Sequence, residues 1–202
     1  MDSVKITLLC DGSSDRVIIP IVEKLFDKHC HSGLDFDLAT NLPNNAKTLP
    51  QRIQATLLLY PCDLLIIHRD AEGQSNNRRT EIANAVAGLN QTYVIAMPIK
   101  MTEAWLLCDQ QAIRHAAGNV HGNASLGIPP ISKIETCDAK IILFAALRAA
   151  ADLGTHRLQK FNPEQRRHLV AEQLFDFTSL RRLSSFADFE HQVIAYCNSI
   201  PC

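Results

Sequence analysis

Residues 62–73 read CDLLIIHRDAEG, and this stretch decides the fold class. Cys62 to His68 is the strongest strand in the chain, because Leu64 to Ile67 is continuously apolar. Such a run is typical of a strand that lies in a parallel sheet with helices on both faces. The polar residues Ala71 to Asn77 then predict a loop at the carboxyl end of this strand.

The segments around this strand alternate between strand and helix patterns. The expected strands are Lys5 to Cys10, Leu34 to Thr40 and Tyr93 to Ile99, and the expected helices run from Ser13 or Ser14 to Phe26, from Pro50 to Leu59 and from Thr80 to Leu89. Pro20 should kink the first turns of the first helix. The alternation predicts an α/β protein with a Rossmann-like, mostly parallel, four-stranded sheet and crossover helices on its faces.

After Pro98 the strand pattern does not return. The remaining expected helices are Glu103 to Ala117, Asp138 to Ala151, Pro163 to Phe175 and Ser185 to Cys197. We therefore expect residues 1–109 to form the α/β domain and residues 110–202 to form a helical extension packed on it, both in one folded unit.

Composition limits the classes of partner. At 202 residues and 47% hydrophobic, the chain can bury a single core. With 20 Lys and Arg against 21 Asp and Glu, it has no global field to attract a polyanion, so nucleic-acid binding must depend on local patches or a bound metal. Seven scattered cysteines without a Cys-x-x-Cys pair argue against a zinc knuckle or a disulfide framework. The first apolar run lacks the features of a signal peptide, and no stretch has the roughly 20 apolar residues that cross a bilayer, so we expect a cytoplasmic protein without a membrane partner.

Acidic residues follow the expected strands. They are Asp11 and Asp15 after the first strand, Asp70 and Glu72 after the third, and Glu103 beyond the fourth. Ligands of open α/β sheets bind beyond the carboxyl ends of the strands. Carboxylates gathered at one edge need cations to neutralise them, and hard oxygen ligands favour Mg²⁺ or Mn²⁺. The sequence therefore predicts a divalent-metal site whose ligands are Asp11, Asp15, Asp70 and Glu72.

Several of these residues have structural alternatives. In an extended stretch Asp70 and Glu72 share one face, but such a pair is also common in solvated turns. Asp15 lies in the first turn of a helix, where the helix dipole stabilises a carboxylate whatever its function. Glu103 is either a direct or indirect metal ligand or simply the start of a helix. We expect Trp105 to be a core anchor.

Basic residues near the expected loops are candidates for binding phosphate or nucleic acid. They are Arg69, Arg78, Arg79, Lys100 and Lys140. Arg78 and Arg79 follow the acidic loop and can clamp a substrate phosphate, neutralise the carboxylates, or belong to a solvated loop. We expect His68 to be a hydrogen-bonded structural residue, and the Arg166 to His168 helix face to serve ordinary packing and solvation.

Four segments carry a resemblance to a known family. They are Cys10 to Asp15, Asp70 to Glu72, Pro98 to Asp109, and Leu183 to Phe186. The first two resemble the Glu-Gly turn and the Asp-x-Asp motif of Toprim domains, found in topoisomerases, primases and overcoming-lysogenization-defect nucleases. All four together resemble a bacterial family of stand-alone Toprim-like proteins, often encoded beside ATPases in phage-defence loci. The most specific piece is Glu103 to Asp109, with its order of an acid, a small residue and a tryptophan.

The resemblance implies a Toprim fold and hydrolysis of nucleic-acid phosphodiesters with one or two Mg²⁺ ions. Asp70 and Glu72 would bind metal, Asp11 would complete the coordination or act as general base, and Glu103 would assist at the catalytic site. The resemblance also implies an ATPase partner, since this chain has no P-loop motif of its own. It leaves open whether the substrate is DNA or RNA.

The departures from the family pattern define a rival hypothesis. Asp11 and Asp15 stand where the family has Glu, and Glu72 stands where it has Asp. Since positioning errors of about 1 Å can cost catalysis roughly 100-fold, the rival is a non-catalytic binding or regulatory subunit with a degenerate site. Such a subunit would dock an ATPase or a homodimer mate. A weaker third reading is a phosphatase, because Asp70 to Gly73 resembles the nucleophile turn of haloacid-dehalogenase-like enzymes, although that turn follows the first strand of its fold.

Overall fold

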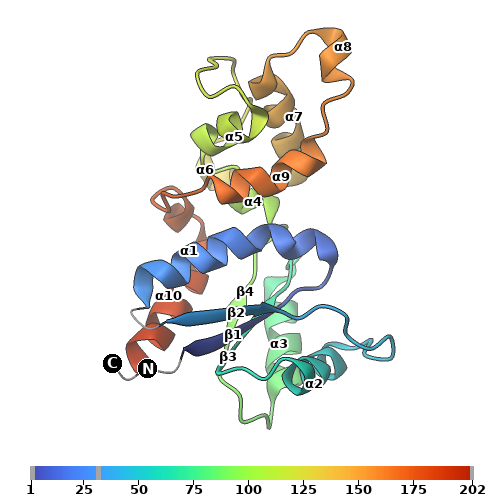
Figure 1. Cartoon of the computed structure of the whole chain (residues 1–202), viewed down its shortest axis with the longest axis vertical. Helices are drawn as coiled ribbons and strands as arrows, with labels where there is room; N and C mark the ends of the chain where they lie inside the picture. Colours follow the sequence, from blue (N-terminus) through green and yellow to red (C-terminus); the bar gives the residue numbers. More distant parts are fainter. Residues whose placement is uncertain (1–2, 31–32, 201–202) are drawn as a thin grey trace.

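Four parallel strands form the sheet of the protein, described here for residues 3–30 and 33–200 of a computed structural model (Figure 1). The strands are β1 (Val4–Leu9), β2 (Leu34–Leu38), β3 (Leu64–His68) and β4 (Tyr93–Ala96). They lie side by side in the order β2-β1-β3-β4, and each neighbouring pair is parallel. The predicted α/β class and Rossmann-like four-stranded sheet are confirmed.

Helices cover both faces of this sheet. The helical segments are η1 (Ser13–Ile18), α1 (Ile19–His29), α2 (Leu49–Leu59), α3 (Ser75–Val86), α4 (Glu103–Leu106), α5 (Gln110–Ala117), α6 (Ile131–Ile134), α7 (Ala139–Ala151), α8 (Thr155–Leu158), α9 (Pro163–Glu172), η2 (Leu180–Arg182) and α10 (Ser184–Ser199). Side chains alternate along each strand, so Leu8 packs into the core that includes α1 and α10, and Leu9 packs into the core of α2 and α3. The sheet is thus the middle of three layers.

The residues after 109 form the expected helices, but the last of these helices belongs to the layers around the sheet. Buried residues of α5, α7 and α9 join the same core as β1 and α1, which supports one folded unit. Helix α10 returns to the edge strand β4, where Gln192 accepts a hydrogen bond from the Ile95 N–H at 2.9 Å and donates one to the Ile95 carbonyl at 3.3 Å. These bonds satisfy a strand edge that would otherwise be open.

A disulfide bond joins Cys30, at the end of α1, to Cys197 of α10. This corrects the expectation that the cysteines form no disulfide framework. The two residues are 167 positions apart, and only the return of α10 to the sheet brings them together. The bond links the two helices that cover one face of the sheet.

Two helix boundaries differ from the prediction. The expected helix from Glu103 to Ala117 is interrupted, because the Asp109 carboxylate accepts from the N–H groups of Gln111 and Ala112 and begins α5. Helix α3 begins at Ser75, five residues before the expected start at Thr80.

The region around Pro20 also differs from the prediction. Pro20 is the second residue of α1, where a proline is tolerated, and the expected kink is a junction between η1 and α1. Helix α9 ends at Glu172, before the expected Phe175, and the Lys24 ammonium donates to the carbonyls of Ala171 and Leu174 at this end. Within the described residues, no helix combines the length and apolar composition needed to cross a membrane.

Candidate functional site

An acidic pocket lies where the direction of strand addition reverses. The chain passes from β1 to β2 on one side and then crosses to β3 on the other, so the reversal point is between β1 and β3. Ligands of open α/β sheets bind in the crevice at this point. The acidic pocket has a volume of about 350 Å³ and is lined by Asp11, Gly12, Ser14, Asp15, Asp70, Glu72 and Arg78. All four residues expected to bind metal therefore border one cavity.

Asp11 is held by two arginines. Its Oδ1 accepts from Nη1 of Arg52 at 2.8 Å, and its Oδ2 accepts from Nε of Arg69 at 2.9 Å. Arg69 also donates to Glu81 of α3 at 2.6 Å. Because both oxygens of Asp11 already have cationic partners, this carboxylate is less suited to act as a general base.

Glu72 lies in a tight turn within the predicted loop, so the shared face that an extended stretch would give Asp70 and Glu72 does not apply. Its φ is 51°, in the left-handed region that side chains other than glycine seldom adopt. The turn is fastened to the segment after β4, since the N–H groups of Ala71 and Gly73 donate to the carbonyls of Pro98 and Ile99. Arg78 donates to the Glu72 carboxylate at 2.8 Å. Backbone strain of this kind clusters at functional sites, and here it directs Glu72 to the pocket that Asp70 also borders.

A buried histidine links the two remaining carboxylates. Thr102 donates its hydroxyl hydrogen to Asp70 Oδ1 at 2.9 Å and lies 2.9 Å from Nε2 of His68. The hydroxyl has only one hydrogen to give, so the neutral imidazole carries its proton on Nε2. Its Nδ1 then has no hydrogen-bond partner among the described residues and faces Asp15 Oδ2 at 3.7 Å. His68 is thus a structural connector, as expected.

Asp15 also closes the turn after β1. Its Oδ2 accepts from the N–H of Gly12 at 3.0 Å, which is the capping role considered as its structural alternative.

The carboxyl group of Asp70 lies in an environment that disfavours its charge. The pKa of its carboxyl group is raised to about 7, mainly by burial and also by the charges of Asp15 and Glu103, and the hydrogen bond from Thr102 opposes this shift. No lysine or arginine in the described part of the chain pairs with this side chain. Asp70 is therefore the carboxylate of the pocket that would gain most from a bound ion.

The pocket's donor set fits a hard divalent cation, because every acidic ligand offers oxygen. Over residues 3–30 and 33–200, however, no three His, Cys, Asp or Glu side chains are grouped closely enough to hold an ion as they stand. The reason is geometric: Asp11 and Glu72 point to arginines, and Asp15 points to a backbone N–H. Metal binding would need at least one of these side chains to exchange its partner.

Glu103 belongs to a buried ion pair. It is the first residue of α4, and its carboxylate pairs with the guanidinium of Arg167. Arg167 also donates to the carbonyl of Ser14 at 3.0 Å, so α4 and α9 are both tied to the turn that carries Asp15. Glu103 does not line the acidic pocket. Its charge still acts on the carboxyl group of Asp70.

Only some of the expected phosphate-binding residues reach the pocket. Arg78 lines it, and Arg69 contacts Asp11. Arg79 instead pairs with Asp188 of α10 at 2.7 Å, and Lys140 pairs with Glu164 of α9 at 3.5 Å. Lys100 contributes its carbonyl, which accepts from the N–H of Glu72 at 3.3 Å.

Comparison with protein-family models, curated proteins and solved structures found no match.

Sequence reasoning missed Arg52 and gave Arg167 no specific role. Nothing near Arg52 in the sequence marks it, because only the packing of α2 beside β1 brings it to Asp11. Arg167 did carry a signal: it precedes Val170 and Ala171, both buried, by three and four residues, which places it on the inner face of α9.

Trp105 is the core anchor that the sequence predicts. It is fully buried, its Nε1 donates to Ser185 Oγ at 2.9 Å, and its ring packs against Phe186 and Phe189. The two most C-terminal of the four segments that carry the family resemblance thus pack against each other. This contact holds α4 against α10.

Proposed function

We propose that the protein is a metal-dependent nuclease that hydrolyses phosphodiester bonds at the acidic pocket. The observation that carries this proposal is that Asp11, Asp15, Asp70 and Glu72, from two distant segments, border one cavity at the reversal point of a parallel sheet. The same placement, an acidic turn after the first strand and an acid-x-acid turn after the third, agrees with the resemblance to Toprim domains.

The metal of this proposal is Mg²⁺ or Mn²⁺, held by Asp70, Glu72 and Asp15. Asp70 supports it most, because its pKa is raised to about 7, mainly by burial, and a nearby cation would stabilise the charged carboxylate that burial disfavours. When bound, such an ion polarises a phosphoryl oxygen and makes a coordinated water easier to deprotonate.

The chain's own residues supply the phosphate contacts. Arg69 and Arg78 present guanidinium groups, which suit bidentate contacts to phosphate. Each is now paired with carboxylates, so a substrate phosphate would compete for these arginines and release Asp11 or Glu72 toward the pocket. Glu103 and Arg167 act indirectly, because their ion pair holds the turn from Ser14 to Asp15 in place.

A second candidate is a non-catalytic subunit that docks an ATPase or another copy of the chain. The observation that favours it is that Asp11 and Glu72 are already neutralised by Arg52, Arg69 and Arg78. In this case the ion pairs are the permanent state of the site.

Cleavage assays on plasmid DNA and on RNA, with Mg²⁺, Mn²⁺ or EDTA, separate the two candidates. The nuclease should cut only with metal, and Asp70→Asn should slow cutting by at least about 100-fold, the scale of loss when a catalytic group is misplaced. Asp27→Asn is the matched control, since Asp27 is an exposed acid of α1. Metal binding by calorimetry without cleavage would support the second candidate. Hydrolysis of p-nitrophenyl phosphate alone would indicate a phosphatase.

A further inference from the structure

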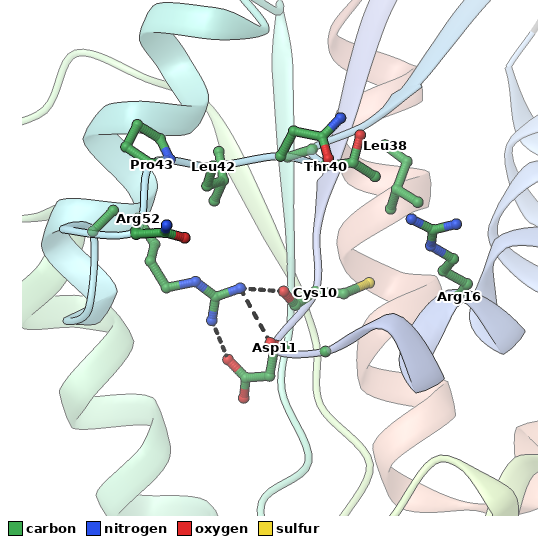
Figure 2. A pocket seen from close by; sticks show the side chains of 13 residues that line it. Cys10, Asp11, Arg16, Leu38, Thr40, Leu42, Pro43 and Arg52 are labelled. Carbon is green, nitrogen blue, oxygen red and sulfur yellow. Dashed lines mark hydrogen bonds and ion pairs between the residues drawn. The ribbon is translucent and has the colours of Figure 1, made fainter.

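A second, basic pocket adjoins the acidic one. Its volume is about 460 Å³, within the range of roughly 300–1,000 Å³ that is usual for ligand sites. The turn Cys10 to Gly12 forms its floor, and the segment from Leu38 to Ala46 closes one side (Figure 2). It lies at the carboxyl ends of β1 and β2, the same edge of the sheet as the acidic pocket. We call this cavity the basic pocket.

The two pockets carry opposite charges. The basic pocket is lined by Arg16 and Arg52 with Asp11 as its acid, whereas the acidic pocket has four carboxylates and Arg78. Arg16 forms no ion pair with any described residue, so its charge is available to a ligand. A chain with a net charge of -1 thus has a local cationic cavity beside its carboxylates.

The guanidinium of Arg52 is fixed before any ligand arrives. It donates to Asp11 Oδ1 at 2.8 Å, to the Asp11 carbonyl at 3.4 Å, and to the Cys10 carbonyl (Figure 2). Only 20% of its side chain is exposed. A group that is already ordered loses less entropy when it binds an anion. Figure 2 shows Arg16, from η1, on the opposite side of the same turn.

The wall after β2 offers polar groups as well. Asn41 has a φ of 55°, a left-handed conformation that asparagine tolerates. The side chains of Asn41 and Asn44 make no hydrogen bond to another described residue and border the pocket. Tyr60 holds the start of this wall by donating to the Thr40 carbonyl at 2.5 Å. Free amide groups both donate and accept, as the sugars and bases of nucleotides require.

Gly12 forms the boundary between the two pockets, and neither packing nor backbone explains a glycine there. Its φ of -141° is one that any residue adopts, and an added Cβ would meet only Ser14 Oγ at 3.7 Å. Because glycine has no side chain, however, no side chain of residue 12 stands between the two pockets. A ligand that occupies both pockets would have to cross it.

We propose that the basic pocket binds the nucleotide next to the scissile phosphodiester of a nucleic-acid strand that crosses Gly12. Arg16 and Arg52 hold its phosphate, and Asn41 and Asn44 contact its sugar or base. This inference rests on the proposed nuclease function, because it assigns the acidic pocket to the cleaved bond. Such a pocket would give a protein without a global positive field a local site for a polyanion.

The test is binding of a fluorescein-labelled single-stranded DNA oligonucleotide, measured by polarisation in EDTA so that no cleavage occurs. Arg16→Gln should weaken binding about 10-fold and lower the salt slope by about one, the effect of losing one phosphate contact. Arg157→Gln is the matched control, because Arg157 is an exposed arginine of α8, far from the sheet in Figure 1. Equal effects of the two substitutions would overturn the proposal.

A second variant tests the path across the boundary. Gly12→Leu should weaken oligonucleotide binding while its melting temperature stays near that of the wild type, since the added side chain meets no packed neighbour. Adenosine monophosphate serves as the competing probe. If it binds as tightly as the oligonucleotide and loses as much affinity in Arg16→Gln, the ligand is a free nucleotide and the strand path is overturned.

Failure of this inference and failure of the proposed function give different results. If oligonucleotide binding depends on Arg16 but the protein cleaves no nucleic acid, the basic pocket is supported and the nuclease function is rejected. If the protein cleaves nucleic acid with metal but Arg16→Gln leaves oligonucleotide binding unchanged, the nuclease function is supported and the role of the basic pocket is rejected.

Discussion

The carboxylate of Glu103 and the guanidinium of Arg167 form an ion pair across 64 residues of sequence, and each side chain is less than 10% exposed. Arg167 reaches further, to the Ser14 carbonyl, so this pair connects α4 and α9 with the turn after β1. Burying a charge is unfavourable unless it is paired, and here each group compensates the other.

We therefore expect Arg167→Met to destabilise the protein by about 3–5 kcal/mol, because it leaves Glu103 buried without a partner. The double variant Glu103→Leu, Arg167→Met should be more stable than that single variant, since it buries no unpaired charge. Urea unfolding measures both. Arg157→Met, an exposed arginine, controls for the loss of charge. A double variant less stable than Arg167→Met would contradict this account.

Asp70 should make stability depend on pH. Its pKa is raised from 3.8 to about 7 by burial and by neighbouring negative charges, so between these values the folded state binds more protons than the unfolded state. The free energy of unfolding should fall as pH rises through this window. Asp70→Asn removes the effect, and the variant should be the more stable protein at about pH 8 and similar to wild type at about pH 4.

The measurement is urea unfolding in EDTA at both pH values, with Asp27→Asn as control. A difference between Asp70→Asn and wild type that is the same at both pH values would show that burial of the charged carboxyl is not its cause.

The disulfide gives a third prediction. Cys197→Ser should lower the free energy of unfolding by about 2–4 kcal/mol, because the bond between Cys30 and Cys197 closes a long loop in the unfolded chain. Dithiothreitol should bring the wild type to the stability of the variant and leave the variant unchanged. If the reductant alters both proteins equally, a different group is responsible.

How far the sequence predicts this molecule depends on the range of the interaction. The four strands and the acidic turns at residues 11 and 70 follow from local patterns, the apolar run and the polar residues that end it. The contacts of Arg52, Arg167 and Cys197 depend on tertiary packing between segments that are distant in sequence. The residue pattern of one segment does not predict which side chains of a distant segment will contact it.

The turn around Glu72 lies between these cases. The sequence predicts a loop here in which Asp70 and Glu72 serve one site, but it leaves open whether the two residues are extended or form a turn. The structure places Ala71 fully buried between them and Glu72 in the left-handed region, and both still border the acidic pocket. Tertiary bonds to the segment after β4 impose this conformation against the local preference.

We therefore expect the left-handed conformation of Glu72 to lower the stability of the fold while its carboxylate contributes to metal binding. Glu72→Gly removes the strain of a left-handed side chain and should stabilise the fold by about 1 kcal/mol, while Glu72→Gln keeps the strain and leaves stability nearly unchanged. Both variants lose the carboxylate, so both should bind Mn²⁺ more weakly than the wild type in calorimetric titration. Undiminished Mn²⁺ binding in both would exclude Glu72 as a ligand. A Glu72→Gly variant no more stable than Glu72→Gln would show that the turn stores no strain at this residue.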